Sequence, residues 1–220
     1  MAPLEPQKKV LVSADFLDTA HGEYECVDCH GGDSNAPDKE GAHKGLDPFP
    51  SQNNPQETCG ECHDEIAQSA SKSLHATLST FPGFLQKRAN EETWPKVDHG
   101  RDRHCASCHA SCGACHVSRP QYVGSGFING HKFRARPDTI NQCMACHGSR
   151  IGNEFAGNRG QGDVHVRKYT MVCKDCHSAT EMHAAAPEGL KNRYHLDEAV
   201  HCTDCHQGLQ FGSVRDHRIH

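Results

Sequence analysis

The stretch Cys105-Ala-Ser-Cys108-His109-Ala-Ser-Cys112-Gly-Ala-Cys115-His116 holds two copies of the motif CxxCH, separated by two residues. CxxCH is the attachment sequence for c-type haem. Its two thiols bond to the haem vinyl groups, and its histidine becomes an axial ligand of the iron. Because only Ala110 and Ser111 separate the two copies, the haems attached to them must lie almost in contact. The stretch therefore predicts a tightly packed haem pair.

Five further copies flank this pair, and the seven motifs together contain all 14 cysteines of the chain. We therefore expect seven covalently bound c-type haems. The expected thioether positions are Cys26, Cys29, Cys59, Cys62, Cys105, Cys108, Cys112, Cys115, Cys143, Cys146, Cys173, Cys176, Cys202 and Cys205. The expected proximal iron ligands are His30, His63, His109, His116, His147, His177 and His206.

Paired cysteines also occur in two other kinds of site. Zinc ribbons use CxxC pairs to build tetrahedral sites, but they do not need a histidine after every second cysteine. An even cysteine count in an oxidising compartment also suits disulfides. A disulfide framework, however, gives no reason to repeat one spacing seven times. The pattern favours haem over both alternatives.

The composition does not support an ordinary hydrophobic core. Hydrophobic residues make up 35% of the 220 residues and aromatic residues 6%, and the mean hydropathy is −0.74. Such a chain buries too little apolar surface to offset the conformational entropy lost on folding. We therefore expect a mostly irregular fold with short α-helices and little or no sheet, wrapped as a multihaem cytochrome c around a chain of stacked haems.

The motif spacing predicts one domain, residues 1–220, with loose halves 1–104 and 105–220. After the central pair the intervals between motifs are 26, 25 and 24 residues, a repeat of about 30 residues with one haem each. Between the second and third motifs we expect a helix from Cys59 to about Leu78, capped by Thr58. A second helix is expected from Gly83 or Phe84 to Trp94, ended by Pro95.

Twelve of the 19 histidines lie outside the motifs, which is more than seven irons need as sixth ligands. The plain alternative for each is a solvated or propionate-bonded side chain. Because most interval loops carry a spare histidine, we expect bis-histidine ligation throughout, with some ligands crossing to another repeat's haem. The candidate distal ligands are first His43, His75, His104, His131, His165, His183 and His217, and then His21, His201 and His220.

Other side chains have weaker assignments. Four methionines are possible thioether ligands, and Met144 inside a motif is poorly placed for that role. Several basic residues flank the ligand candidates and are expected either to pair with haem propionates or to remain on exposed loops. They are Arg134, Arg136, Arg159, Arg167 and Lys168.

The charge and hydropathy patterns limit the partners. The formal net charge is −5, and haem propionates make it more negative, which argues against nucleic-acid binding. No apolar run is long enough for a transmembrane helix, and the start of the chain lacks a secretory signal. Because c-type haem is attached outside the cytoplasmic membrane, we expect a periplasmic or extracellular protein whose signal peptide has been removed.

The motifs resemble those of multihaem c-type cytochromes. The segment Cys112-Gly-Ala-Cys115-His116-Val-Ser-Arg-Pro120, with Gly130-His131 and Cys143-Met-Ala-Cys146-His147-Gly148, is similar to the haem-pair region of the octahaem tetrathionate reductase group. That likeness covers roughly Cys105 to His206, and it implies parallel and T-shaped haem stacking. The departure is that this chain has seven motifs and no lysine that matches that group's exchangeable haem ligand.

These observations favour electron transfer over catalysis. Closely spaced six-coordinate haems leave no open site for a substrate, so we expect a carrier, or the subunit of an extracellular haem filament joined by histidines ligating haems of the next copy. Expected partners are redox proteins or extracellular electron acceptors. The alternative is a reductase of an oxidised sulfur or nitrogen compound with one open haem, for which His99, His195 and Lys168 are candidate acid–base groups.

Overall fold

The computed structural model describes residues 12–105, 110–158, 160, 162–190 and 195–208. In that part of the chain the backbone is helical or irregular, and its only β contacts are isolated bridges. The longest single helices there, α6 (Asp64–Ala70) and α9 (Trp94–Gly100), have seven residues each. The expectation of short helices with little or no sheet is therefore confirmed.

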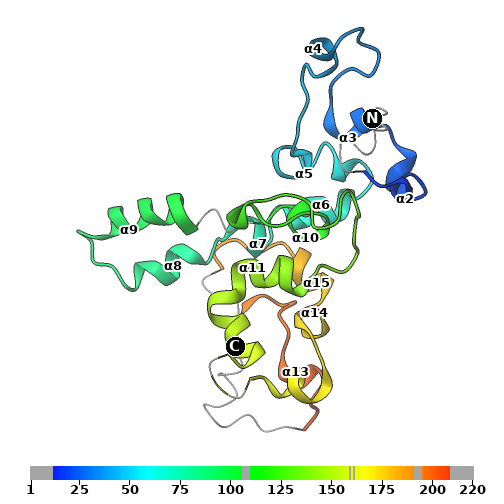
Figure 1. Ribbon diagram of the computed structural model, residues 1–220. Coiled ribbons are helices and arrows are strands. Elements are labelled where there is room, and N and C mark those ends of the chain that lie inside the picture. Colours follow the sequence, from blue (N-terminus) through cyan, green and yellow to red (C-terminus); the bar gives the residue numbers. More distant parts are fainter. Residues whose placement is uncertain (1–11, 106–109, 159, 161, 191–194, 209–220) are drawn as a thin grey trace.

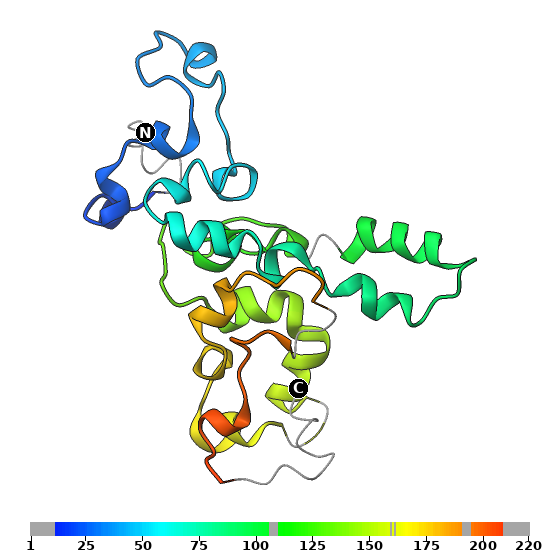
Figure 2. The ribbon, with the colours of Figure 1, turned by 180° about the vertical axis from the view of Figure 1, so that it is seen from behind.

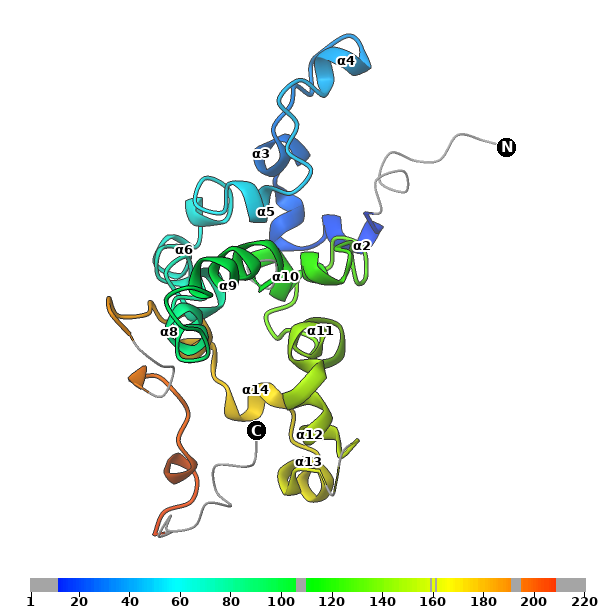
Figure 3. The ribbon, with the colours of Figure 1, turned by 90° about the vertical axis from the view of Figure 1, so that its left-hand side faces the viewer.

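The body of the molecule is elongated, with the N-terminal segments at one end and the C-terminal third at the other (Figures 1 and 3). The N-terminal end is built from five short helical turns. They are α2 (Ala14–Leu17), η1 (Ala20–Glu23), α3 (Cys26–His30), α4 (Lys39–Ala42) and α5 (Pro50–Asn53).

A middle layer joins segments that are far apart in the sequence. The Ala110 amide donates to the His75 carbonyl at 2.8 Å, and Ser73 forms an antiparallel bridge with Ala185. The first half of the chain is therefore tied to two parts of the second half through the three residues from Ser73 to His75. The layer contains η2 (Cys59–Glu61), α6, α7 (Leu74–Thr77), α10 (Cys112–His116) and α15 (Ala179–His183).

The far end of the body contains the last three motifs (Figure 1). It includes a continuous run of helical turns from Thr139 to Ala156, in which π and α turns alternate. The elements outside the middle layer after residue 120 are η5 (Gln121–Val123), η6 (Thr139–Cys143), α11 (Met144–His147), η7 (Gly148–Gly152), α12 (Asn153–Ala156), α13 (Val164–Tyr169), α14 (Cys173–Cys176) and η9 (Cys202–Asp204).

A helical hairpin of α8 (Phe81–Gln86) and α9 projects sideways from the body (Figures 1 and 2). The expected single helix from Gly83 or Phe84 to Trp94 is wrong, because Trp94 begins the second helix. Pro95 occupies the first turn of α9, where its missing N–H removes no helical hydrogen bond. Pro95 therefore starts a helix that we expected it to end.

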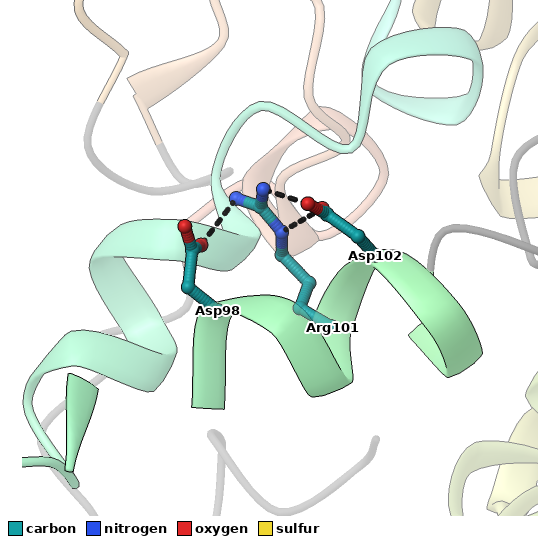
Figure 4. Close-up of polar contacts among 3 residues, drawn as sticks. All are labelled: Asp98, Arg101 and Asp102. Atoms are coloured by element: carbon teal, nitrogen blue, oxygen red, sulfur yellow. Dashed lines mark hydrogen bonds and ion pairs between the residues drawn. The ribbon is translucent and has the colours of Figure 1, made fainter. Parts of the chain in front are cut away.

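Arg101 fixes the junction between α9 and the π-helical turn η3 (Arg101–Cys105) that follows it (Figure 4). Its guanidinium group contacts Asp98 at 3.2 Å and Asp102 at 2.6 Å. The Arg101 side chain is 24% exposed. The two carboxylates balance its charge and hold the hairpin to the chain that leads into the third motif.

The expected helix from Cys59 to Leu78 is also wrong, because the chain breaks into three pieces. Ser73 adopts an extended conformation, and its hydroxyl accepts a hydrogen bond from the Ala76 amide, which caps α7. Thr58 does not cap η2, and its hydroxyl instead donates to the Asn54 carbonyl at 2.9 Å. A serine that competes with the helix backbone is the physical reason for the break before α7.

Three motifs share a cap that their sequence carries inside the CxxCH spacing. Asp28, Asp175 and Asp204 each precede the second cysteine of a motif. Each carboxylate accepts a hydrogen bond, at 2.7 to 2.8 Å, from the backbone N–H of the residue before the first cysteine. This contact is half of a capping box, so the polypeptide alone shapes the turn on which the two cysteines lie.

The described residues form almost no apolar interior. Only four hydrophobic side chains are buried there, namely Ala67, Ala114, Val117 and Leu196, and no large side chain is fully buried. By contrast, 14 large hydrophobic residues are exposed. The packing of the polypeptide against itself therefore does not account for a stable fold.

None of the helices in the described residues has the length and apolar content needed to cross a membrane.

The contact of α10 with α5 depends on Gly113, because a Cβ atom there would collide with the Ser51 hydroxyl. The hydroxyl can rotate away, but Ser51 Cβ lies 3.1 Å from the added atom. We therefore expect Gly113→Ala to cost about 1 kcal/mol through overpacking, which lowers the thermal midpoint of the purified protein by a few degrees. Gly100→Ala is the matched control, since a Cβ atom there meets nothing within 4 Å. Adding Ser51→Gly to Gly113→Ala should restore the midpoint, and equal midpoints for the two single variants would contradict the prediction.

Candidate haem site

Five motif histidines each face one histidine from outside the motifs. In every pair the two residues are at least 41 positions apart in the sequence, and the ring centres are 5.7 to 6.3 Å apart. The fold therefore brings a non-motif imidazole to each of these five motifs. The pairs are His30 with His131 (6.0 Å), His63 with His21 (6.3 Å), His116 with His183 (6.0 Å), His147 with His75 (6.1 Å) and His206 with His165 (5.7 Å).

This spacing matches that of two imidazoles on opposite sides of one metal ion. Metal–imidazole bonds of about 2.0–2.1 Å place opposed Nε2 atoms about 4 Å apart and their ring centres about 6 Å apart. The Nε2 atoms of His165 and His206 are 3.4 Å apart, which is hydrogen-bond distance and shorter than that separation. No group of three or more His, Cys, Asp or Glu side chains in the described residues is arranged to hold a metal ion. Each pair could supply two ligands to a metal ion whose remaining ligands come from a bound cofactor such as haem.

Hydrogen bonds fix the tautomer of two motif histidines. The Nδ1 atoms of His30 and His116 lie 2.8 Å and 2.7 Å from the carbonyl oxygens of Asp47 and Arg134. A carbonyl oxygen only accepts, so each Nδ1 must carry the proton and donate it. The lone pair is then on Nε2, which is the arrangement that metal-bound histidines have.

The non-motif histidines of three pairs are held in the neutral form. Burial, and then the neighbouring His147, lowers the pKa of His75. The pKa of His21 falls through burial and His63, and the pKa of His183 falls through burial and His116. A neutral imidazole is the form that binds a metal.

The thiols of different motifs lie close enough together to form a continuous series. Cys59 of the second motif and Cys112 of the fourth are hydrogen-bonded, which lowers the pKa of Cys59 to about 6 and raises that of Cys112. The same contact between the fifth and sixth motifs lowers the pKa of Cys173 to about 6 and raises that of Cys143.

The charges of the remaining neighbouring cysteines in this series also influence one another. After burial, the charges of Cys59 and Cys62 raise the pKa of Cys29. Cys205 and Cys202 act in the same way on Cys176. Since Cys115 also acts on Cys143, the series runs through motifs one, two, four, five, six and seven. None of the twelve cysteines in these six motifs forms a disulfide.

Arg134 carries a buried donor that no group in the described residues satisfies. Its Nη1 atom is fully buried without a hydrogen-bond partner, while its backbone carbonyl accepts the His116 Nδ1 proton. A buried donor without a partner costs about 1–3 kcal/mol. A haem propionate beside His116 would complete this group with a charge-assisted hydrogen bond, so the residues present fit haem.

An aromatic cluster packs on two of the non-motif histidines. Phe133 stacks on His21 with ring centres 4.2 Å apart and planes 5° apart. Phe127 lies 4.3 Å from His131, and Phe16 contacts both His131 and Phe133. The cluster therefore fixes the orientation of the rings that face the first and second motifs.

Other sequence candidates have a different placement. His43 is exposed at the end of α4, and His201 is exposed before η9. Neither is among the paired rings, nor are the exposed His99 and His195. The remaining site candidates lie outside the described residues, either wholly or in their side chains. They are Cys105, Cys108 and His109 of the third motif, and His104, His217 and His220.

Two carboxylates that contact His177 and His165 are not among the candidates that the sequence predicts. Glu181 accepts a hydrogen bond from Nδ1 of His177 at 2.9 Å, and Asp163 accepts one from Nδ1 of His165 at 2.9 Å. A sequence signal exists for the first, since Glu181 follows His177 at the i,i+4 spacing. The second requires the Asp-x-His turn at the start of α13 to be known.

Comparison with known proteins gave no match to any family model, curated protein or solved structure.

Arg134 provides a test of the fit to haem. We expect Arg134→Met to lower the reduction potential of one of the seven haems, because removal of a nearby positive charge favours the oxidised iron. An optical redox titration of the purified protein measures this shift. Arg119→Met is the matched control, since Arg119 is exposed three residues after His116. Identical titrations of both variants would show that Arg134 has no partner on the haem.

Proposed function

We propose that the protein transfers electrons through seven covalently bound c-type haems. The observation that carries the proposal is the set of five opposed histidine pairs, each joining a motif histidine to a distant one at the spacing of an axial ligand pair. When bound, haem supplies a reversible one-electron couple at each motif.

Contacts within the polypeptide orient several of the paired histidines. The paired residues come from segments between 41 and 101 residues apart, so each pair fixes two parts of the chain relative to one another. Backbone carbonyls orient His30 and His116, and the Phe133 ring orients His21. Ligands held in this way need little rearrangement when the charge on the iron changes.

The order of the motifs in space supports conduction rather than isolated redox centres. The thiol neighbours connect six described motifs in the order of the chain, from α3 at one end of the body to η9 at the other. At the five motifs that have an opposed pair, protein would occupy both axial positions, and such haems would exchange electrons with one another and not with a bound substrate. Electron transfer is thus supported better than reduction of a sulfur or nitrogen compound.

The haem content and the ligand pairing can be tested together. Intact-mass measurement of protein matured with its haem-attachment machinery should give seven added haems. We expect His131→Ala to convert one of the seven haems from low spin to high spin, because it removes the ligand that faces His30. Electron paramagnetic resonance of the oxidised protein measures the spin state.

His43→Ala is the matched control, because His43 is exposed and outside the pairs. Its spectrum should be that of the unchanged protein. A polypeptide without added haem would overturn the proposed function, and a high-spin signal from His43→Ala rather than His131→Ala would overturn the pairing.

A further inference from the structure

We infer that Glu181 and Asp163 lower the reduction potentials of the haems at the sixth and seventh motifs, so that electrons run toward the N-terminal end of the molecule. The inference rests on the proposed function. In it the two carboxylates are positioning residues that act through His177 and His165, and neither touches the haem iron.

The two carboxylates are built into the ligand shell. The Oε2 atom of Glu181 lies 2.9 Å from Nδ1 of His177, and the Glu181 side chain is only 13% exposed. The Oδ1 atom of Asp163 lies 2.9 Å from Nδ1 of His165, and its side chain is 4% exposed. His177 is the proximal ligand of the sixth motif, and His165 faces His206 of the seventh.

Local structure places both carboxylates. Glu181 lies on α15, which begins where the Ser178 hydroxyl accepts the Glu181 amide proton at 3.1 Å. Asp163 is the N-cap of α13 and also accepts the His165 backbone amide at 2.7 Å. Each carboxylate is therefore fixed by its own helix start, independently of the other.

In the first and fourth motifs the proximal histidine has a different kind of hydrogen-bond acceptor. Their proximal histidines donate to neutral backbone carbonyls, those of Asp47 and Arg134. The exposed carboxylates around the first motif, such as Glu23 and Glu25, are in water, which screens their charge. The buried carboxylates of the last two motifs are screened much less.

A carboxylate in this position favours the oxidised iron in two ways. It draws the Nδ1 proton toward itself, which makes Nε2 a stronger electron donor to the metal. Its negative charge, in surroundings of low dielectric constant, also stabilises the form of the haem that carries one more positive charge. Both effects lower the reduction potential of that haem relative to one whose ligand donates to a carbonyl.

The difference in reduction potential between these haems and the haem of the first motif runs along the length of the body. The carboxylate-backed ligands belong to motifs at the end of the body formed by α13 and α14, whereas the carbonyl-backed His30 lies on α3 at the opposite end (Figure 1). Electrons move spontaneously from low to high potential. An electron that enters at the C-terminal motifs therefore leaves through the N-terminal end.

The test compares Glu181→Gln, Asp163→Asn and the double variant with the unchanged holoprotein. Both amides keep the size of the side chain and an accepting oxygen but remove the charge. In an optical redox titration, each single variant should move mainly one haem's part of the absorbance change from the low-potential end of the curve to higher potential. A smaller shift of a neighbouring haem is expected, because the charge of Glu181 also acts on His75 and that of Asp163 on Cys176. The double variant should move the absorbance changes of two haems. Electron paramagnetic resonance should show one altered low-spin component in each single variant.

Glu92→Gln is the matched control, because it removes the same charge from an exposed position in the α8–α9 hairpin; its curve should overlie that of the unchanged protein. Curves for Glu181→Gln and Asp163→Asn that also overlie it, or shifts confined to the high-potential end, would overturn the inference. Loss of haem from either variant would also count against it, because the carboxylate would then hold the fold and not tune the iron. Absence of haem from the unchanged protein would instead overturn the proposed function.

Discussion

The opposition of two imidazoles from distant parts of the chain is the constraint on which this structure depends. Each pair closes a loop of between 41 and 101 residues. For a covalent cross-link, closure of a loop of about 100 residues removes roughly 4.7 kcal/mol of unfolded-state entropy in the chain-entropy treatment. Iron bound by both histidines would act in the same sense, so that the proposed cofactor would be a structural component as well as a redox centre.

This constraint also explains why the polypeptide buries so little of itself. Four small or medium apolar side chains form the core of the described residues, and 14 large ones are exposed. Helices of seven residues or fewer are marginal in water without tertiary support. Short caps, such as those made by Asp28 and Asp204, shape the motif turns instead. The side chains of the described residues therefore do not form a hydrophobic core of their own.

The sequence identified the motif residues and the class of fold, because CxxCH spacing and low apolar content are local properties. It also named every non-motif histidine that the structure places beside a motif, but not which motif each would face. That assignment depends on how distant segments pack, as with His75 and His147, and no local pattern encodes it. Helix limits were misjudged where one side chain decides the outcome, namely Ser73 and Pro95. Glu181 and Asp163 were missed because their role exists only once a neighbouring ring is in place.

The projecting hairpin of α8 and α9 has a practical consequence. Arg101 braces its base, and its tip stands clear of the body that carries the ligand pairs (Figures 1 and 4). A peptide tag inserted at that tip would give the molecule a handle in a known orientation. Immobilised on an electrode through this handle, the protein would lie with its long axis along the surface, and both ends would remain accessible to soluble redox partners.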